Sequence, residues 1–281
     1  MNDSSFITLC NWNMQQNPEA WSRLEELRRT HGVQVALLQE AVPPSRGDWT
    51  TYPSATATDL WAISAHADRQ LNFASVVAVL DPALTSNPVA PTALGQAEYG
   101  KFAVSHPGQF SVVEVGTRSG QTITVISLYG IWDRDDRYLF SEATLHRAIS
   151  DLTLLLQEKD RTHVVLAGDL NLFFEWDRAE YDSYWAPRYN TVFTRLAAYG
   201  LNLVGPFGDL PLEGCKCGRG DECRHVRTFA FQRKPENRLN QLDYVFATPS
   251  LRPVECQALD DGAAWQYSDH LPVITTFMVG V

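Results

Sequence analysis

The middle of the chain is a succession of short segments rich in β-branched and aromatic residues. Between residues 60 and 128 these segments are separated by clusters of proline, glycine, asparagine and aspartate, which is the pattern expected between strands. Ser119 and Gly120 lie between the last two segments and predict a hairpin. A chain with so many short strands can bury their apolar faces only by packing sheet on sheet. Further strands are expected at residues 6–12, 33–38, 162–167, 226–231, 242–246 and 273–278.

Few segments predict helices. Leucine and isoleucine at positions 145, 149, 152 and 156 form the i, i+4, i+7 and i+11 stripe of an amphipathic helix. Asn17 and Pro18 offer an N-cap and a first-turn proline for a helix over residues 17–27, and a third helix is expected over residues 189–199. We therefore expect a single domain over residues 1–281, with helices outside the sheets and a turn-rich insertion at about residues 205–225.

Composition excludes several classes of protein. Apolar residues make up 44% of the chain and charged residues 20%, a balance typical of globular proteins rather than disordered ones. The longest apolar stretches, such as residues 74–80, are too short to cross a bilayer, and no basic and apolar leader opens the chain. The five cysteines are an odd number, which argues against a disulfide framework. We therefore expect a cytoplasmic protein that does not engage a membrane.

The charge balance also limits the function. The chain has 23 basic and 33 acidic residues, a net charge of −10. A protein that wraps nucleic acid over much of its surface needs a broad basic face, which this balance argues against. An enzyme that grips one phosphate through a divalent cation stays compatible with it, because carboxylates are the ligands that such a cation prefers.

Polar groups stand directly beyond several of the expected strands. Taken alone, each has an ordinary structural explanation, such as a solvated strand end, an Asx turn or a capped turn. Their recurrence at strand ends is instead typical of a functional site built on a rigid scaffold. The pieces are Trp12-Asn13, Gln39-Glu40, Gly168-Asp169-Leu170-Asn171, Leu242-Asp243-Tyr244 and Ser268-Asp269-His270.

The order of these pieces, from Asn13 to His270, resembles the endonuclease/exonuclease/phosphatase superfamily, which includes the deoxyribonuclease-I-like and exonuclease-III-like phosphodiesterases. The resemblance spans essentially the whole chain. It implies an α/β fold, a four-layer α-β-β-α sandwich in which two mostly antiparallel β-sheets pack face to face with helices on both outer faces. It also implies a divalent-metal-dependent hydrolase of phosphoric ester bonds, usually with magnesium.

The resemblance assigns a metal site to three residues. Glu40 matches the metal-binding glutamate of the family, Asn13 the asparagine beside it, and Asp269 the aspartate of the closing Asp-His pair. The implied ion is Mg²⁺, or Mn²⁺ in its place. A hard cation at this position would neutralise the charge that builds on the non-bridging oxygens of a phosphodiester under attack.

The resemblance also assigns catalytic roles. Asp169 matches the aspartate that orients or deprotonates the attacking water, and Asn171 matches its partner. Asp243 matches the carboxylate that pairs with His270, which would bias the imidazole toward its charged form. Tyr129 stands where the family places a tyrosine or histidine against the phosphate.

Three departures narrow the choice within the superfamily. Inositol-phosphate phosphatases follow Gly-Asp-Leu-Asn with an aromatic residue and an arginine, whereas residues 172–176 read Leu-Phe-Phe-Glu-Trp. Those phosphatases also carry Cys-Asp-Arg near the late aspartate, whereas residues 241–244 read Gln-Leu-Asp-Tyr. Abasic-site endonucleases carry an asparagine shortly after the tyrosine, whereas residues 130–133 read Gly-Ile-Trp-Asp. The resemblance therefore favours the nuclease branches without the abasic-site specialisation.

A second group of metal-ligating residues lies in the turn-rich insertion. Cys215, Cys217, Cys223 and His225 follow one another within eleven residues, and three thiolates with one imidazole are a common set for structural Zn²⁺. The Cys-x-Cys spacing is tighter than the usual Cys-x₂-Cys. The alternatives are free thiols or a disulfide formed on oxidation.

The segment around this cluster is basic. From Lys216 to Arg238 it holds seven basic and three acidic residues, a local net charge of +4. A basic rim beside a metal site suits a polyanion such as DNA or RNA, and we expect Arg227 and Phe229 to contact the substrate. The alternatives are a solvated charged face and, for the phenylalanine, packing in the core.

These observations favour a metal-dependent phosphodiester hydrolase, a nuclease that acts on DNA or RNA by metal-assisted in-line attack of water. Two alternatives stay open. One is a phosphoesterase of the same fold that acts on a small-molecule or lipid phosphate. The other is a catalytically silent binding module, which the filled set of polar positions argues against. The sequence does not indicate which protein partners, if any, the chain has.

Overall fold

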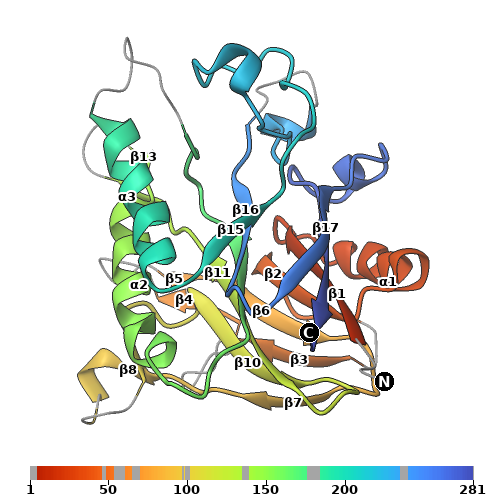
Figure 1. The fold of residues 1–281 in the computed structure, drawn as a ribbon, viewed down its shortest axis with the longest axis vertical. Helices are drawn as coiled ribbons and strands as arrows, with labels where there is room; N and C mark the ends of the chain where they lie inside the picture. Colours follow the sequence, from red (N-terminus) through yellow and green to blue (C-terminus); the bar gives the residue numbers. More distant parts are fainter. Residues whose placement is uncertain are drawn as a thin grey trace.

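The structure, a computed structural model, describes residues 5–45, 49–53, 61–64, 70–96, 98, 102–134, 139–175, 184–234 and 240–280. Two six-stranded sheets pack face to face, and helices cover the outer face of each (Figure 1). The four-layer sandwich implied by the sequence is therefore confirmed. None of the helices in these residues is long and apolar enough to span a membrane.

The first sheet combines the beginning and the end of the chain. Its strands, in spatial order, are β17 (Arg252–Ala258), β18 (Val273–Val279), β1 (Ser5–Asn13), β2 (Val35–Ala41), β6 (Ala74–Val79) and β3 (Thr50–Pro53). The second sheet comes from the middle of the chain. Its strands, in spatial order, are β15 (Asn202–Gly205), β16 (Asp243–Ala247), β14 (Val164–Asp169), β11 (Thr122–Tyr129), β10 (Phe110–Gly116) and β7 (Thr85–Pro88).

Three α-helices, four short 3₁₀ helices and three short strand pairs complete the described structure. The α-helices are α1 (Ala20–His31), α2 (Glu142–Leu156) and α3 (Trp185–Ala198). The pairs are β4 (Ile63–Ser64) with β5 (Gln70–Leu71), β8 (Thr92–Ala93) with β9 (Ala103–Val104), and β12 (Asp133–Arg134) with β13 (Leu139–Phe140).

The alternation of side chains along each strand builds three apolar layers. In β1, Leu9 points between the two sheets, whereas Cys10 and Trp12 point outward to α1. In β14, Val165 faces the first sheet and Leu166 faces α2 and α3. Both faces of the central strands are therefore buried, which explains why these strands read as nearly continuous apolar runs.

Strand direction brings the predicted site residues to one edge of the two sheets. β1 runs parallel to β2, so Asn13 and Glu40 arrive at the same end of the first sheet. β14 ends at Asp169, and the antiparallel β16 begins beside it at Asp243. His270 precedes β18, which is antiparallel to β1 and therefore begins where β1 ends.

Buried polar contacts join the sheets close to this edge. Gln39 Nε2 donates to Ser127 Oγ across the sandwich at 2.9 Å, and Ser127 Oγ donates to the carbonyl oxygen of Leu38 at 2.8 Å. These contacts fix the sheets relative to each other where the functional side chains emerge, because each buried polar group depends on its partner in the other sheet.

Two local predictions were wrong. The first helix begins at Ala20 rather than at the Asn17-Pro18 step, because Asn17 Oδ1 accepts the backbone N–H of Glu19 at 3.0 Å in a turn before the helix. The strand expected at residues 226–231 is absent from the described structure. Phe229 instead forms isolated bridges with Asn240 and His270, because this segment crosses the sheet edge rather than extending it.

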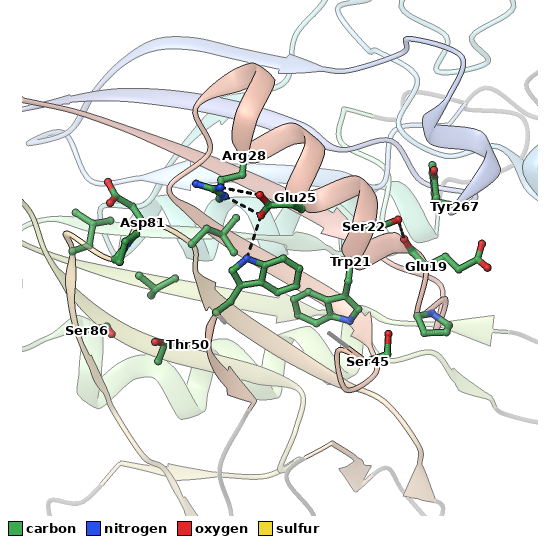
Figure 2. A pocket seen from close by; sticks show the side chains of 16 residues that line it. Glu19, Trp21, Ser22, Glu25, Arg28, Ser45, Thr50, Asp81, Ser86 and Tyr267 are labelled. Atoms are coloured by element: carbon green, nitrogen blue, oxygen red, sulfur yellow. Dashed lines mark hydrogen bonds and ion pairs between the residues drawn. The ribbon is translucent and has the colours of Figure 1, made fainter. Parts of the chain in front are cut away.

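A hollow of about 1260 Å³ lies beside α1, between it and the residues around β3 (Figure 2). Trp21 and Trp49 stack there with ring centroids 5.3 Å apart. Glu25 accepts hydrogen bonds from Arg28 and from the indole of Trp49. The lining contains no side chain that the sequence assigns to the metal or catalytic set, so this hollow is distinct from the candidate active site.

Candidate active site

Glu40 is presented by a distortion of β2. The pairing of β2 with β6 shifts register between Leu38 and Ala41, and Glu40 has a φ of 45°, a left-handed conformation that is costly for a residue with a side chain. The resulting bulge turns the Glu40 carboxylate toward the edge of the sheets. Oε1 accepts hydrogen bonds from Asn13 Nδ2 at 3.3 Å and from the Tyr129 hydroxyl at 2.9 Å.

Asn13 connects Glu40 to Asp169 across the two sheets. Its Nδ2 also donates to Asp169 Oδ2, at 2.9 Å. Asn171 holds the same carboxylate through its backbone N–H, which donates to Oδ1 at 2.9 Å, and through its side-chain amide, which donates to Oδ2 at 3.2 Å. Like Glu40, Asn171 has a positive φ, of 51°, a conformation that asparagine adopts more readily than most residues.

Asp169 is 1% exposed, and its environment favours the protonated form. Burial raises the pKa of Asp169 to about 7, although the positive charge of His270 acts in the opposite direction. The carboxylate of Asp243 adds to the upward shift. A carboxyl group with a pKa near neutrality is suited to exchange a proton with water.

His270 lies between three carboxylates. Its Nδ1 is 2.8 Å from Asp243 Oδ2, and its Nε2 is 3.7 Å from Asp169 Oδ2 and 3.9 Å from Asp269 Oδ1. Burial acts to lower the pKa of His270, but the charges of Asp243 and Asp169 outweigh it and raise the pKa to about 10. The imidazole is therefore cationic at neutral pH and is oriented by the Asp243 hydrogen bond.

The support around His270 includes residues that sequence reasoning gave no role. Ser268 Oγ accepts the backbone N–H of His270 at 3.0 Å and donates to the carbonyl oxygen of Asn13 at 2.6 Å. Trp12 Nε1 donates to the carbonyl oxygen of His270 at 2.9 Å. Thr228 Oγ1 accepts the backbone N–H of Asp243 at 3.2 Å. Ser268 and Trp12 belong to the strand-end motifs identified in the sequence. Their hydroxyl and indole N–H groups could therefore have been recognised as candidates for hydrogen bonds within the site.

The residues around Glu40 fit a hard divalent cation. Glu40, Asn13 and Asp269 offer oxygen ligands, which magnesium and manganese prefer. Burial raises the pKa of Tyr129 well above its usual range, and the negative charges of Glu40 and Asp169 raise it further. These charges make the local electrostatic potential negative. The carboxylate of Glu40 also raises the pKa of Asp269, in addition to burial, and a cation near the two would relieve their repulsion.

A different set of possible ligands, made of Asp169, Asp243 and His270, has its ligand atoms within 4.8 Å of one another. The 2.8 Å contact between His270 Nδ1 and Asp243 Oδ2 is a hydrogen-bond distance, which leaves no room for an ion between these two atoms. We therefore interpret this set as a triad beside the metal site, in which Asp243 is hydrogen-bonded to His270 and Asp169 lies 3.7 Å from the other ring nitrogen.

Among the described residues, Arg233 is a basic residue whose charge acts on this site; it was counted in the local charge but given no role from the sequence. Its Nε donates to Gln15 Oε1 at 2.6 Å, and its charge lowers the pKa of Asp269, against the larger effect of burial. Arg227, the predicted substrate contact, instead forms an ion pair with Asp260 at 3.5 Å. Arg238 lies outside the described residues.

Phe229, the other predicted substrate contact, packs against the catalytic edge. Its ring centroid is 4.9 Å from that of His270, with the planes inclined by 52°, and it is only half-buried. The ring therefore supports the imidazole while keeping part of its surface accessible. A role in substrate binding stays a prediction for both Phe229 and Arg227.

The four predicted zinc ligands come together in a separate cluster. The ligand atoms of Cys215, Cys217, Cys223 and His225 lie within 4.8 Å of one another. His225 Nδ1 is 3.5 Å from Cys215 Sγ and 3.6 Å from Cys223 Sγ. This cluster shares no residue with the triad or with the Glu40 site.

Comparison with known proteins agrees with this arrangement. The sequence model of the Endonuclease/Exonuclease/phosphatase family matches residues 10–270. The chain belongs to this family. Its members are metal-dependent enzymes of the nuclease and phosphodiesterase type, which places the chain among phosphoester hydrolases at the level of the superfamily. A search of the curated proteins finds no match.

Solved structures of the endonuclease/exonuclease/phosphatase family share the fold over nearly the whole chain. The endonuclease domain of TRAS1, a telomere-specific non-LTR retrotransposon, is 19% identical with a TM-score of 0.61, covering 96% of this chain and 98% of that domain. A family member from Beutenbergia cavernae is 18% identical with a TM-score of 0.59, covering 98% and 72%. The AP endonuclease LMAP from Leishmania major is 13% identical with a TM-score of 0.59, covering 97% and 88%. At these identities the likeness concerns the fold.

Proposed function

We propose that this member of the endonuclease/exonuclease/phosphatase family is a divalent-metal-dependent nuclease that hydrolyses phosphodiester bonds of DNA or RNA. The observation that carries the proposal is the link made by Asn13, whose amide bonds both Glu40 and Asp169. Through this link a predicted metal ligand and a predicted water-activating carboxylate stand side by side, with the cationic His270 next to Asp169.

Glu40, Asn13 and Asp269 are the residues that would hold the ion. When bound, Mg²⁺ or Mn²⁺ supplies charge neutralisation at the non-bridging oxygens of the phosphate. The Glu40 carboxylate is already oriented by Tyr129 and by Gln16, whose Nε2 donates to Oε2 at 3.2 Å. Fixed ligands of this kind reduce the reorganisation needed on binding.

Asp169 is the group that we expect to orient the attacking water. Asn13 and Asn171 hold its two oxygens in place, so that a water bound to it has a defined direction toward the phosphorus atom. With its pKa near neutrality, the carboxylate accepts the proton that water loses as it attacks.

His270 is the group that we expect to act on the phosphate, as Asp169 acts on the attacking water. Its Nδ1 is bonded to Asp243 and its Nε2 faces Asp169, so the Nε2 proton is directed to the place where the reacting phosphate would lie. A fixed cationic donor stabilises the charge that develops on the phosphate oxygens in the transition state. The proton is also available to the leaving oxygen.

Two observations favour a nucleic acid over a small phosphate. The solved structures of similar fold include proteins named as endonucleases. In addition, Arg233 reaches the site from the segment that carries the local positive charge. A guanidinium beside the metal site is suited to a neighbouring phosphate of a polynucleotide.

The first test is a substrate panel with a metal titration. We expect Mg²⁺ or Mn²⁺ to support cleavage of single-stranded DNA, duplex DNA or RNA, and a chelator to abolish it. Glu40→Gln preserves the shape of the side chain but removes its charge, so it should raise the metal concentration for half-maximal activity by about tenfold or more. Cleavage of a small phosphodiester or a lipid phosphate, with none of the nucleic acids, would contradict the nuclease proposal and favour the phosphoesterase alternative.

A second test compares two arginines of the basic segment. Arg233→Ala should raise the KM for an oligonucleotide by about tenfold, because one charge-assisted phosphate contact is lost, and should reduce the salt dependence of binding by about one ion. Arg227→Ala removes the same charge from a residue already paired with Asp260, so its effect should be smaller. A larger effect at Arg227 would support the sequence-based assignment and contradict the role given to Arg233.

A further inference from the structure

The geometry points to a structural Zn²⁺ site formed by Cys215, Cys217, Cys223 and His225, which fastens the turn-rich segment to the loop that follows Asp169. The site is independent of the proposed nuclease activity, since it uses none of the residues of the metal site beside Glu40. Four protein ligands would close the coordination shell, which is the arrangement of structural rather than catalytic zinc.

The distances fit a tetrahedral ion. Zinc lies about 2.3 Å from sulfur and about 2.0–2.1 Å from imidazole nitrogen, so that ideal tetrahedral angles separate the two ligand atoms by about 3.6 Å. His225 Nδ1 stands 3.5 Å from Cys215 Sγ and 3.6 Å from Cys223 Sγ. All four ligand atoms lie within 4.8 Å of one another.

The hydrogen bond that His225 makes through Nε2 leaves its Nδ1 available as a metal ligand. Its Nε2 lies 2.7 Å from the carbonyl oxygen of Phe174. A carbonyl can only accept, so Nε2 carries the proton and Nδ1 presents its lone pair to the sulfur atoms. A histidine that ligates zinc through one nitrogen and donates from the other to a backbone carbonyl is the usual arrangement at such sites.

The local backbone explains the tight Cys-x-Cys spacing. Gly214 and Gly218 flank the first two ligands with φ values of 74° and 86°, a region that is open to glycine at little cost. The chain can therefore turn back on both sides of Cys215 and Cys217.

A disulfide explains this arrangement less completely than a zinc ion does. It would join two of the three sulfur atoms and leave the third sulfur and the oriented Nδ1 of His225 without a function. Cys217 and Cys223 are 1% and 2% exposed, so neither is placed as an accessible redox thiol.

Contacts of the ligands connect this cluster to the catalytic edge. Phe174, which His225 binds, follows Asn171 by three residues, and its backbone N–H donates to the hydroxyl of Tyr244 at 3.0 Å. Arg219, between the second and third ligands, pairs with Glu175 at 3.3 Å. A zinc ion would therefore hold the segment after Asp169 in place through side chains of the turn-rich segment, which lies at the top of Figure 1.

The residues that follow His225 in the chain connect the cluster to His270. Three residues after His225, Thr228 accepts the backbone N–H groups of Leu242 and Asp243 at 3.0 and 3.2 Å. The next residue, Phe229, packs against the His270 ring. Zinc removal should therefore loosen both partners of the Asp243–His270 pair.

The test measures metal content before activity. Protein purified without chelator should contain about one equivalent of zinc by elemental analysis, and cobalt substitution should give the charge-transfer absorption of a thiolate-bound, tetrahedral ion. Cys217→Ser and His225→Ala should each lose most of the zinc. Cys256→Ser is the matched control, because Cys256 lies in β17 outside the cluster, and it should retain the full equivalent.

The wild-type protein supplies a readout that does not depend on how the variants fold. Extraction of zinc should lower the midpoint of thermal unfolding by several degrees, and added zinc should restore it. Folded wild-type protein that binds neither zinc nor cobalt would overturn the proposal. A mass two hydrogens lower than the reduced chain, with a disulfide mapped to these cysteines, would do so as well. A chain that binds zinc but cleaves no nucleic acid would leave this site intact and contradict only the proposed nuclease function.

Discussion

Asp169→Asn is expected to lower kcat by about 10²-fold or more while leaving the fold intact. The substitution keeps the size of the side chain but removes the group that accepts the proton of the attacking water, and loss of a general base has this order of effect. Steady-state cleavage of the best nucleic acid of the panel, at saturating metal, is the measurement. Activity near that of the wild-type protein would refute the role of Asp169.

The same variant separates a catalytic role from a structural one. Burial raises the pKa of Asp169, so an uncharged amide relieves the cost of burying its charge, but the amide also places an N–H group against the donors Asn13 and Asn171. We therefore expect the melting temperature of metal-free Asp169→Asn to fall by only a few degrees relative to the wild-type protein. A marked loss of stability together with the loss of activity would indicate that Asp169 acts mainly by holding the sheets together.

His270→Gln should also lower kcat by about 10²-fold or more, because the variant lacks the cation and the proton that the transition state requires. His270 is bonded to Asp243 at 2.8 Å and faces Asp169, so removing its charge leaves buried carboxylates without a counter-charge and destabilises the protein. Asp243→Asn is the complementary variant, since it preserves the imidazole but removes the partner that orients it. Normal turnover in both variants would contradict the triad.

The charge of His270 gives this prediction a readout other than activity. In the metal-free protein the carboxylates of Asp243, Asp169 and Asp269 face the imidazole, and its pKa rises to about 10 from an ordinary 6.5. A raised histidine pKa adds stability that is complete below pH 6.5 and is lost as the pH rises through about 10. The melting temperature should therefore fall between pH 7 and 10, and this fall should be smaller in His270→Gln. An imidazole NMR signal that titrates near 6.5 would contradict the cationic assignment.

Much of the fold followed from the strand pattern, since central strands such as β6 and β14 are continuous apolar runs bounded by turn residues. The edge strands β7, β15 and β17 were missed because their outer faces are solvated and carry no apolar pattern. Proline at position 253 further obscures β17. The false strand at residues 226–231 has the right residue types, but its hydrogen bonds go to Asn240 and His270, which only tertiary structure can decide.

Part of the candidate site could be predicted from the sequence for a similar reason. Asn13, Glu40, Asp169 and His270 stand at strand ends, and strand direction alone brings them to one edge. The bulge that turns Glu40 was not predictable, because a positive φ at a glutamate has no local sequence signal. Arg233 was likewise hidden, since a count of charges does not say which arginine of a loop turns inward.

The two ends of the described chain are neighbours in the first sheet. Ser5 pairs with Val279, and in Figure 1 the start of β1 lies at the opposite end of the molecule from the turn-rich segment. β1 spans nine residues, from Ser5 to Asn13, about 26 Å of extended chain. A tether, fusion partner or solid support attached beyond Ser5 or Val279 therefore leaves the chain at a distance from the candidate active site. A short peptide joining both ends, with new termini opened at the Ser119-Gly120 turn, would leave every residue of that site in its native surroundings.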